Sequence, residues 1–314
     1  MNVIDPHAAL LRWAMLVKTC NVAAERENVV YRVEDNDGAV YAMRFHRKGY
    51  RSAVEIESEL RWMAELDAHA VSVPKPILSK AGTFIETVNG QFVSVLTWLS
   101  GQPLGKASQP LIVDDRLGTF FRFGETLAKL HAISDQWQCP KNFIRPAWDI
   151  DGLTGSEPYW GKYWENPALN ASETQLIIAA RDKARNALLA QSDTLDFGLV
   201  HADVVRENVL IDGSQIRFID FDDCGTGFRL FDIATALLKN QKEPDYAELE
   251  VSLLQGYRSV RPIDTTLLHV FFLLRAFTYL GWIIPRMTES GAQLRNERNI
   301  RASLELATEF VDLH

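Results

Sequence analysis

The sequence predicts an α+β protein with two lobes, a small antiparallel sheet in the first and mainly helices in the second. Three observations lead to this prediction. The chain has 314 residues, about twice the length of a typical domain. β-prone runs predominate up to residue 98, and apolar residues at helical spacing predominate after it. A turn-rich segment at residues 100–103 separates them, so we expect an N-terminal lobe over residues 1–98 and a C-terminal lobe over residues 99–314.

The expected elements of the first lobe are a hairpin, a helix and a later strand. Residues 29–33 and 40–45 are β-prone and flank a Glu-Asp-Asn-Asp-Gly run, which predicts a hairpin. Apolar residues recur at spacings of three and four within residues 52–66 and place one apolar stripe on a helix. Prolines follow, and the next β-prone run, residues 92–99, predicts a strand.

The second lobe is predicted to be mainly helical, with one exception. Residues 209–211 and 216–219 flank a tight Asp-Gly-Ser turn and predict a short hairpin. Asp232 precedes a short helix, where Asp is favoured as an N-terminal cap. Five further segments have helical periodicity: residues 115–131, 173–190, 246–257, 267–284 and 302–311.

Composition and charge narrow the possible functions. The net charge of −8 and the pI of about 5.5 argue against a nucleic-acid partner that is bound by phosphate neutralisation. The most apolar stretch, residues 269–285, carries Arg275 in its middle, so we expect no membrane span and no membrane partner. Residues 1–16 lack the features of a secretory signal. We therefore expect a cytoplasmic protein.

The segment with the clearest chemistry is a loop followed by the short hairpin. His201, Asp203 and Asn208 precede the first strand in the order H-x-D-x-x-x-x-N, and Asp220 follows the second. A tight hairpin brings its outer ends together, so we expect Asn208 and Asp220 to lie close to each other. Mg²⁺ prefers such oxygen ligands together with phosphate oxygens, and Asp203 is placed to accept a hydroxyl proton. The pattern favours a phosphotransfer site over the alternative, solvated loop carboxylates.

These residues resemble the Brenner-type and metal-binding motifs of the aminoglycoside phosphotransferase superfamily, whose members are relatives of the protein kinases. The superfamily includes choline kinases, homoserine-kinase-like enzymes and stress-response kinases. The resemblance extends over nearly the whole chain, and Arg44-Phe45-His46-Arg47 and Arg275 with Tyr279 are most similar to the homoserine-kinase-like and stress-response branch. It implies a protein-kinase-like fold with an N-terminal nucleotide-binding lobe.

The resemblance also implies roles for individual residues. Asp203 corresponds to the catalytic base, Asn208 and Asp220 to the magnesium ligands, and His201 to a residue that braces the loop. Arg44 stands where the family usually has the Lys that holds the nucleotide phosphates, and it would pair with Glu59 as that Lys does. Arg keeps the charge but differs in geometry. From the residues alone, Arg44 and Glu59 fit a structural ion pair equally well.

Three weaker features complete the sequence-based interpretation. No G-x-G-x-x-G follows the first strand, where residues 21–28 take its place. Asp222, two residues beyond Asp220, either assists the metal or is simply solvated. Residues 146–164 are rich in aromatic side chains, which suit a cationic acceptor by cation–π attraction; packing between helices is the favoured alternative.

We therefore expect an ATP-dependent phosphotransferase that moves the γ-phosphoryl group of ATP to the hydroxyl group of a small molecule. The expected acceptor is an amino alcohol, an aminoglycoside or a homoserine-like compound, and the expected cofactor is Mg²⁺. One alternative is a serine/threonine protein kinase of the stress-response type. A second is a nucleotide-binding regulator with little catalysis, which the Arg at position 44 suggests.

Overall fold

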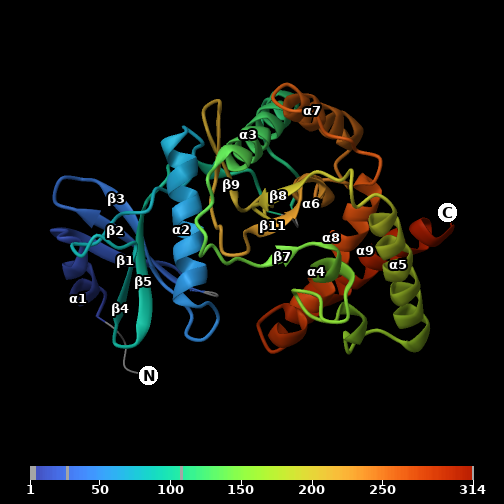
Figure 1. The fold of residues 1–314 in the computed structure, drawn as a ribbon, viewed down its shortest axis with the longest axis horizontal. Coiled ribbons are helices and arrows are strands. Elements are labelled where there is room, and N and C mark those ends of the chain that lie inside the picture. Colours follow the sequence, from blue (N-terminus) through green and yellow to red (C-terminus); the bar gives the residue numbers. More distant parts are fainter. Residues whose placement is uncertain (1–4, 26–27, 107–108, 313–314) are drawn as a thin grey trace. The chain divides into compact units, whose positions relative to one another are not determined.

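The structure, a computed structural model, describes residues 5–25, 28–106 and 109–312, so residues 26 and 27 of the segment that replaces the glycine-rich motif lie outside the described part (Figure 1). The chain forms two compact units. The division into lobes at residue 98 remains a prediction. The two units differ from those lobes mainly in residues 136–145 and 209–222, which we predicted in the second lobe and which belong to unit 1. Unit 1 comprises Met1–Gln102, Gln136–Arg145 and Val209–Asp222, and unit 2 comprises Pro103–Asp135, Pro146–Asn208 and Asp223–His314.

Unit 1 is built on a five-stranded antiparallel sheet with the strand order β1-β2-β3-β5-β4. Its strands are β1 (Val17–Glu25), β2 (Val29–Asp35), β3 (Val40–Phe45), β4 (Ile85–Val88) and β5 (Gln91–Thr97). The predicted strands correspond to β2, β3 and β5, whereas β1 and β4 were not predicted. Most of β1 is exposed, so its sequence lacks the alternation that identifies a half-buried strand.

The sheet of unit 1 has its core on the side that the chain start covers. The short helices α1 (Pro6–Leu10) and η1 (Leu11–Trp13) supply Leu10 and Trp13 to this core. They pack against strand residues that include Val33, Met43 and Val95. The Asp5 carboxylate accepts a hydrogen bond from the His7 amide and so caps α1.

The helix α2 (Ala53–Ala68) is present as predicted and lies beside the sheet within unit 1 (Figure 1). Ser52 begins it with a capping box: the Glu55 amide donates to the Ser52 hydroxyl, and the Glu55 carboxylate accepts from the Ser52 amide. Its buried face carries the apolar stripe and also Glu59, which is fully buried. A buried carboxylate needs a partner, because burying an unpaired charge is very costly.

The predicted hairpin is also present, as β9 (Val209–Asp212) and β10 (Gln215–Phe218). Asp212 pairs with Gln215 at the turn and Val209 pairs with Phe218 at the open end. Gly213 has a φ of +59° in the turn, a conformation that glycine adopts at little cost. The Phe218 amide donates to the Ser72 carbonyl, which ties the hairpin into unit 1. In sequence, the two-residue strand β6 (Gln102–Pro103) contains the last residue of a unit 1 segment and the first residue of unit 2.

Unit 2 is mainly helical, and all five helices predicted by periodicity are present. A small mixed sheet of β7 (Ala147–Trp148), β11 (Gly225–Phe228) and β8 (Phe197–Val200) accompanies them. The helical elements are α3 (Arg116–Gln136), α4 (Ile150–Thr154), η2 (Tyr163–Glu165), α5 (Ala171–Ala190), α6 (Arg229–Leu238), α7 (Tyr246–Arg258), α8 (Leu268–Trp282), η3 (Ile284–Arg286) and α9 (Ala292–Asp312).

The most apolar helix of the described residues is α8, which packs against α6 and α9. With its extension to Arg286 it is long and apolar enough to cross a membrane, but 72% of the apolar window is buried inside the protein. Arg275 in its middle is also fully buried. Burial of this kind is what a core helix shows, and a buried arginine needs partners within the fold.

Candidate active site

The loop of residues 201–208 lies between β8 and β9, and Asp232 of α6 holds its start. The Asp232 carboxylate accepts hydrogen bonds from the amides of His201 (2.8 Å) and Ala202 (2.7 Å). Ala202 has a φ of +65°, so these bonds fix a strained backbone. The prediction that Asp232 caps a helix is wrong, because α6 already begins at Arg229. Asp232 instead shapes the loop that carries Asp203.

A buried histidine completes the support of this loop. His131 of α3 contacts the Asp232 carboxylate through Nε2 at 3.0 Å and the Tyr257 hydroxyl through Nδ1 at 2.8 Å. Burial, with nearby arginines, holds the pKa of His131 well below its ordinary value. A neutral His131 donates from Nε2 to the carboxylate and accepts at Nδ1 from the hydroxyl. His201, predicted to brace the loop, is fully buried, and its Nδ1 accepts from the Asp203 amide at 3.3 Å.

Both carboxylate oxygens of Asp203 are held in place. The Asn208 amide group donates to Oδ2 at 2.8 Å and also to the Asp203 carbonyl at 3.0 Å. Arg275 of α8 donates from its guanidinium to Oδ1 at 2.6 Å. Burial raises the pKa of the Asp203 carboxyl, and the charge of Arg275 opposes that rise. The side chain of Asp203 nevertheless stays 22% exposed, so a second molecule is able to reach this oriented carboxylate.

Arg275 itself is held by three aromatic rings and by hydrogen bonds. Its guanidinium lies 4.9 Å from the Trp160 ring, 5.3 Å from Phe231 and 4.5 Å from Tyr279. Its Nε also donates to the Tyr279 hydroxyl at 3.2 Å. From the sequence, Arg275 and Tyr279 were recognised only as positions that are similar to the family, and no role was predicted for either. The available signal was a single charge in an apolar helix, because buried charges are almost always paired.

The two predicted metal ligands lie on either side of the hairpin in sequence. Asn208 immediately precedes β9 in unit 2, and Asp220 follows β10 in unit 1, where its side chain is exposed and its φ is +66°. Because Asn208 directs its NH₂ group to Asp203, its Oδ1 oxygen accepts no hydrogen bond from the described residues. A free amide oxygen and a carboxylate are hard donors that suit Mg²⁺. Within the described residues, no three His, Cys, Asp or Glu side chains gather as a metal cluster.

The predicted pair of Arg44 and Glu59 is present in unit 1. Arg44 on β3 donates to Glu59 on α2 at 2.6 Å, and both side chains are buried. The guanidinium of Arg145 lies 3.6 Å from the other Glu59 oxygen. Burial opposes the ionisation of Glu59, but the two guanidinium groups outweigh it and hold its pKa below the ordinary value. Glu59 is therefore an ionised buried carboxylate with two cationic partners.

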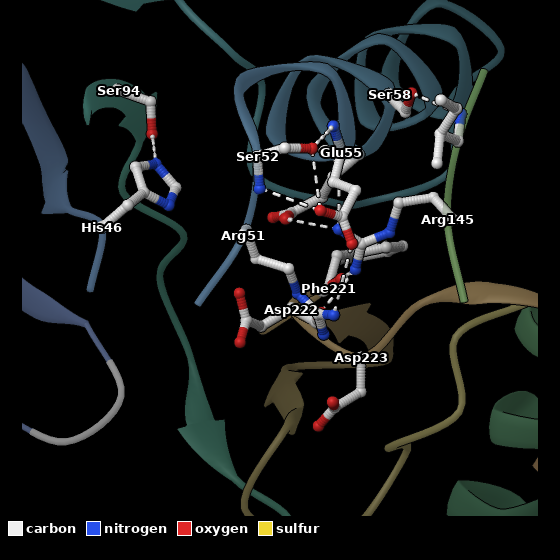
Figure 2. Close-up of polar contacts among 12 residues, drawn as sticks. His46, Arg51, Ser52, Glu55, Ser58, Ser94, Arg145, Phe221, Asp222 and Asp223 are labelled. Carbon is white, nitrogen blue, oxygen red and sulfur yellow. Dashed lines mark hydrogen bonds and ion pairs between the residues drawn. The ribbon is translucent and has the colours of Figure 1, made fainter. Parts of the chain in front are cut away.

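Arg145 and Arg51 also hold the segment that follows Asp220 (Figure 2). Arg51 donates to the Asp222 carbonyl at 2.7 Å, and Arg145 donates to the same carbonyl and to that of Phe221 at 3.2 Å. The Asp222 side chain is buried, which raises the pKa of its carboxyl. Neither arginine was predicted as a site residue. Their partners lie 77 and 171 residues away in sequence, so no local pattern identifies them.

The aromatic segment before α5 contacts cations of the protein itself. Trp148 stacks on Phe231 with ring centroids 5.0 Å apart. Trp160 faces Arg275, and Trp164 faces Arg181 at 4.5 Å. These contacts support the packing interpretation for the buried Trp148, and the choice between packing and acceptor binding for Trp160 and Trp164 stays a prediction.

Comparisons with known proteins agree with this architecture. Residues 19–263 match the model of the phosphotransferase enzyme family, and the chain belongs to that family. A homoserine kinase from Gluconobacter oxydans is 25% identical over 261 residues, which cover 79% of this chain and 75% of that enzyme.

Solved structures extend the comparison to the whole fold. The microcompartment-associated aminopropanol kinase superimposes with a TM-score of 0.82 and 29% identity, over 97% of this chain and 96% of the other. An amicoumacin kinase, solved with AMP-PNP and Ca²⁺, has a TM-score of 0.75 at 21% identity, over 98% and 96% of the two chains. The predicted α+β, protein-kinase-like fold class and the predicted phosphotransferase are confirmed.

Proposed function

We propose that this phosphotransferase moves the γ-phosphoryl group of ATP to the hydroxyl group of a small molecule, with Asp203 as the base. The observation that carries the proposal is the double restraint of Asp203, one oxygen on Arg275 and the other on Asn208. A carboxylate that is oriented and still partly exposed is suited to receive a proton from a bound alcohol. Membership of the phosphotransferase enzyme family supports this reaction class.

The reaction assigns a task to each part of the loop. Asp203 orients the acceptor hydroxyl and takes its proton as the acceptor oxygen bonds to the γ-phosphorus. The bond from that phosphorus to the β,γ-bridging oxygen breaks, and ADP leaves with the electron pair. His201 and Asp232 hold the loop backbone, and Arg275 positions the Asp203 carboxylate. Positioning of this kind contributes a large part of catalysis in phosphoryl transfer.

Asn208 and Asp220 are the residues that would hold the divalent metal, and we assign Mg²⁺ to them. Their oxygen donors fit that ion, and the Oδ1 of Asn208 is not engaged by the described residues. When bound, the metal offsets negative charge on the nucleotide phosphates. The solved amicoumacin kinase holds Ca²⁺ together with AMP-PNP, which supports the use of a divalent ion.

Arg44 and Glu59 are assigned to nucleotide binding. Glu59 holds the guanidinium of Arg44 at one nitrogen, and the buried Nε of Arg44 has no hydrogen-bond partner among the described residues. An arginine fork with unused donors is suited to phosphate oxygens. In this role Glu59 orients Arg44, and Arg145 supplies the second charge that keeps Glu59 ionised.

The acceptor is assigned to the class of small amino alcohols and homoserine-like compounds. Relatives named homoserine kinase and aminopropanol kinase support this assignment, and the net charge of −8 supports the absence of a nucleic-acid partner. A cytoplasmic location without a membrane partner remains our prediction.

The test is phosphoryl transfer from γ-labelled ATP by the purified protein with a panel of alcohols. We expect transfer to at least one small alcohol, loss of transfer on addition of EDTA, and a roughly 10²- to 10⁴-fold lower rate in Asp220→Ala. Labelling of added proteins but of no alcohol would favour the protein kinase instead. Thermal stabilisation by Mg²⁺-ATP without any transfer would favour the nucleotide-binding regulator, and both results would contradict the proposal.

A further inference from the structure

We propose that the acceptor carries a carboxylate in addition to its hydroxyl group, and that the ammonium group of Lys239 binds that carboxylate. The proposal rests on the proposed function and refines it, because it separates hydroxy acids from simple amino alcohols. Lys239 immediately follows the buried helix α6, the helix whose Asp232 holds the loop of Asp203. Nothing in the sequence had drawn attention to it.

The first observation is that Lys239 has no anionic partner among the described residues. Its Nζ lies 4.0 Å from the centroid of the Tyr279 ring, and among the described residues it makes no hydrogen bond and no ion pair. The side chain is only partly exposed, so water solvates the ammonium incompletely. A partly desolvated cation without a counter-ion is a favourable place for an anionic group of a ligand.

The second observation is the position of Lys239 relative to the base. The Tyr279 ring faces the ammonium, its hydroxyl accepts a hydrogen bond from the Nε of Arg275, and Arg275 binds Asp203. A single tyrosine ring and one guanidinium therefore connect Lys239 to the carboxylate that receives the hydroxyl proton. In this proposal a short hydroxy acid binds with its hydroxyl group at Asp203 and its carboxylate at Lys239.

The third observation concerns the other charges around Lys239. The charged groups that act on it are Arg275 and Arg298, which are cationic, and Glu207 and Asp203, which are anionic. Asp203 is already held by Arg275. Burial, together with Arg275, lowers the pKa of Lys239 to about 8, which leaves it mostly protonated at neutral pH. The positive charge is thus present and not neutralised by direct contact.

The aromatic rings of this region argue against the alternative, recognition of an ammonium group alone. The cations on these rings belong to the protein: Lys239 and Arg275 lie over Tyr279, Arg275 also lies over Trp160, and Arg286 lies 4.2 Å from the Trp282 ring. An acceptor recognised only by cation–π attraction would have to displace or share these contacts. A carboxylate that pairs with Lys239 breaks no ion pair, because Lys239 makes none with the described residues.

The experiment compares three acceptors that differ by one group each. L-Homoserine has both the amine and the carboxylate, 3-amino-1-propanol lacks only the carboxylate, and 4-hydroxybutanoate lacks only the amine. In the wild type we expect kcat/KM to be about 10- to 100-fold higher for homoserine than for 3-amino-1-propanol, the range that one charged hydrogen bond supplies. Transfer to 4-hydroxybutanoate should exceed transfer to 3-amino-1-propanol as well.

The variant Lys239→Met should remove that preference. It should lower kcat/KM for the two carboxylate-bearing acceptors by about 10- to 100-fold and leave 3-amino-1-propanol and the KM for ATP unchanged. Lys239→Arg, which keeps a cation, should retain most of the preference. Lys242→Met removes a nearby exposed lysine and should change none of these values. Circular dichroism verifies that each variant is folded.

Several results would overturn the inference. A wild type that uses 3-amino-1-propanol as well as homoserine contradicts it without any variant, so the test stands even if Lys239→Met does not fold. An equal loss for all three acceptors, or a raised KM for ATP, would place Lys239 at the phosphates or in the fold. In each of these cases transfer to an alcohol persists and the proposed function stands, whereas no transfer to any alcohol would refute both.

Discussion

Two carboxylate–arginine clusters, one in each unit, use the same chemistry in different surroundings. In unit 1, Glu59 is fully buried and has two guanidinium partners, Arg44 and Arg145. In unit 2, Asp203 is 22% exposed and has one guanidinium partner, Arg275, and one amide partner, Asn208. Charge neutralisation is more complete around Glu59 and access is greater at Asp203. The comparison teaches that the first cluster stabilises structure and orientation, whereas the second keeps a carboxylate available for chemistry.

The largest effect on stability should follow the removal of the Glu59 charge. Glu59→Gln leaves Arg44 and Arg145 buried without their counter-ion, so we expect the free energy of unfolding to fall by about 3–5 kcal/mol. Urea denaturation measures this change. The matched control is Glu57→Gln on the same helix, whose ion pair with Arg61 is partly exposed and should contribute no more than about 1 kcal/mol. Equal effects of the two substitutions would contradict the claim that the buried Glu59 cluster stabilises the fold.

The corresponding change at Asp203 should affect catalysis more than stability. Arg275→Met leaves the base without its guanidinium partner, and we expect kcat to fall roughly 10²-fold while the affinity for nucleotide is retained. Arg275→Lys keeps the positive charge but loses the planar guanidinium with its several donors. Its rate should therefore lie between those of the wild type and the Met variant.

A buried arginine elsewhere in unit 2 provides the control for Arg275→Met. Arg229 is fully buried and pairs with Asp135 at 2.5 Å, not with Asp203. Added guanidinium ion should restore part of the activity of an Arg275→Ala variant and none of the activity lost in Arg229→Ala. A loss of stability in both variants with no rescue in either would assign Arg275 a purely structural role.

The two arginines that donate to the Asp222 carbonyl, Arg145 and Arg51, should contribute unequally to the free energy of unfolding. Arg145 also contacts Glu59 and the carbonyls of Phe221 and Glu55, whereas Arg51 pairs with the partly exposed Glu55 carboxylate at 3.7 Å. We expect Arg145→Lys to lower the free energy of unfolding by about 1–3 kcal/mol, because buried acceptors lose their donors. Arg51→Lys should cost less, and the reverse order in urea denaturation would contradict this reading of unit 1.

The last predicted effect is a pH dependence of stability within unit 1, which is absent at neutral pH and develops only in acid. Burial, with Arg44, lowers the pKa of His46 to about 3 in the folded protein, whereas an unfolded histidine titrates near 6.5. Below pH 6.5 the unfolded chain therefore binds a proton that the folded chain excludes. The contribution is complete above pH 6.5 and falls by about 1.4 kcal/mol per unit as the pH decreases towards 3.

In the His46→Gln variant we expect the slope to fall by the contribution of one proton, about 1.4 kcal/mol per pH unit. Part of the remaining slope comes from His131. The measurement is urea denaturation between pH 5 and pH 8. An unchanged slope in the variant would show that His46 is protonated in the folded protein.

The sequence predicted the elements that are specified by local patterns. An apolar stripe identified α2, and a tight turn between β-prone runs identified the hairpin of β9 and β10. Family resemblance, together with position in the hairpin, identified Asp203, Asn208 and Asp220 as candidates. The pairing of Arg44 with Glu59 was also predicted, and the structure places the two in direct contact.

The missed features depend on contacts between distant parts of the chain. Asp232 contacts the loop amides 30 and 31 residues away, and Arg275 binds Asp203 across 72 residues. A carboxylate near the start of a helix has the same sequence pattern whether it caps that helix or holds another loop. Arg145 follows no motif at all, and only the folded backbone brings it to Glu59.

The most direct test of the account is the rate of phosphoryl transfer by Asp203→Asn, with nucleotide affinity measured on the same sample. The substitution keeps the size of the side chain and removes its ability to take a proton. We predict unchanged nucleotide affinity and a rate roughly 10²- to 10⁴-fold below that of the wild type. Transfer at a near wild-type rate by a folded Asp203→Asn variant would contradict the assignment of Asp203 as the base.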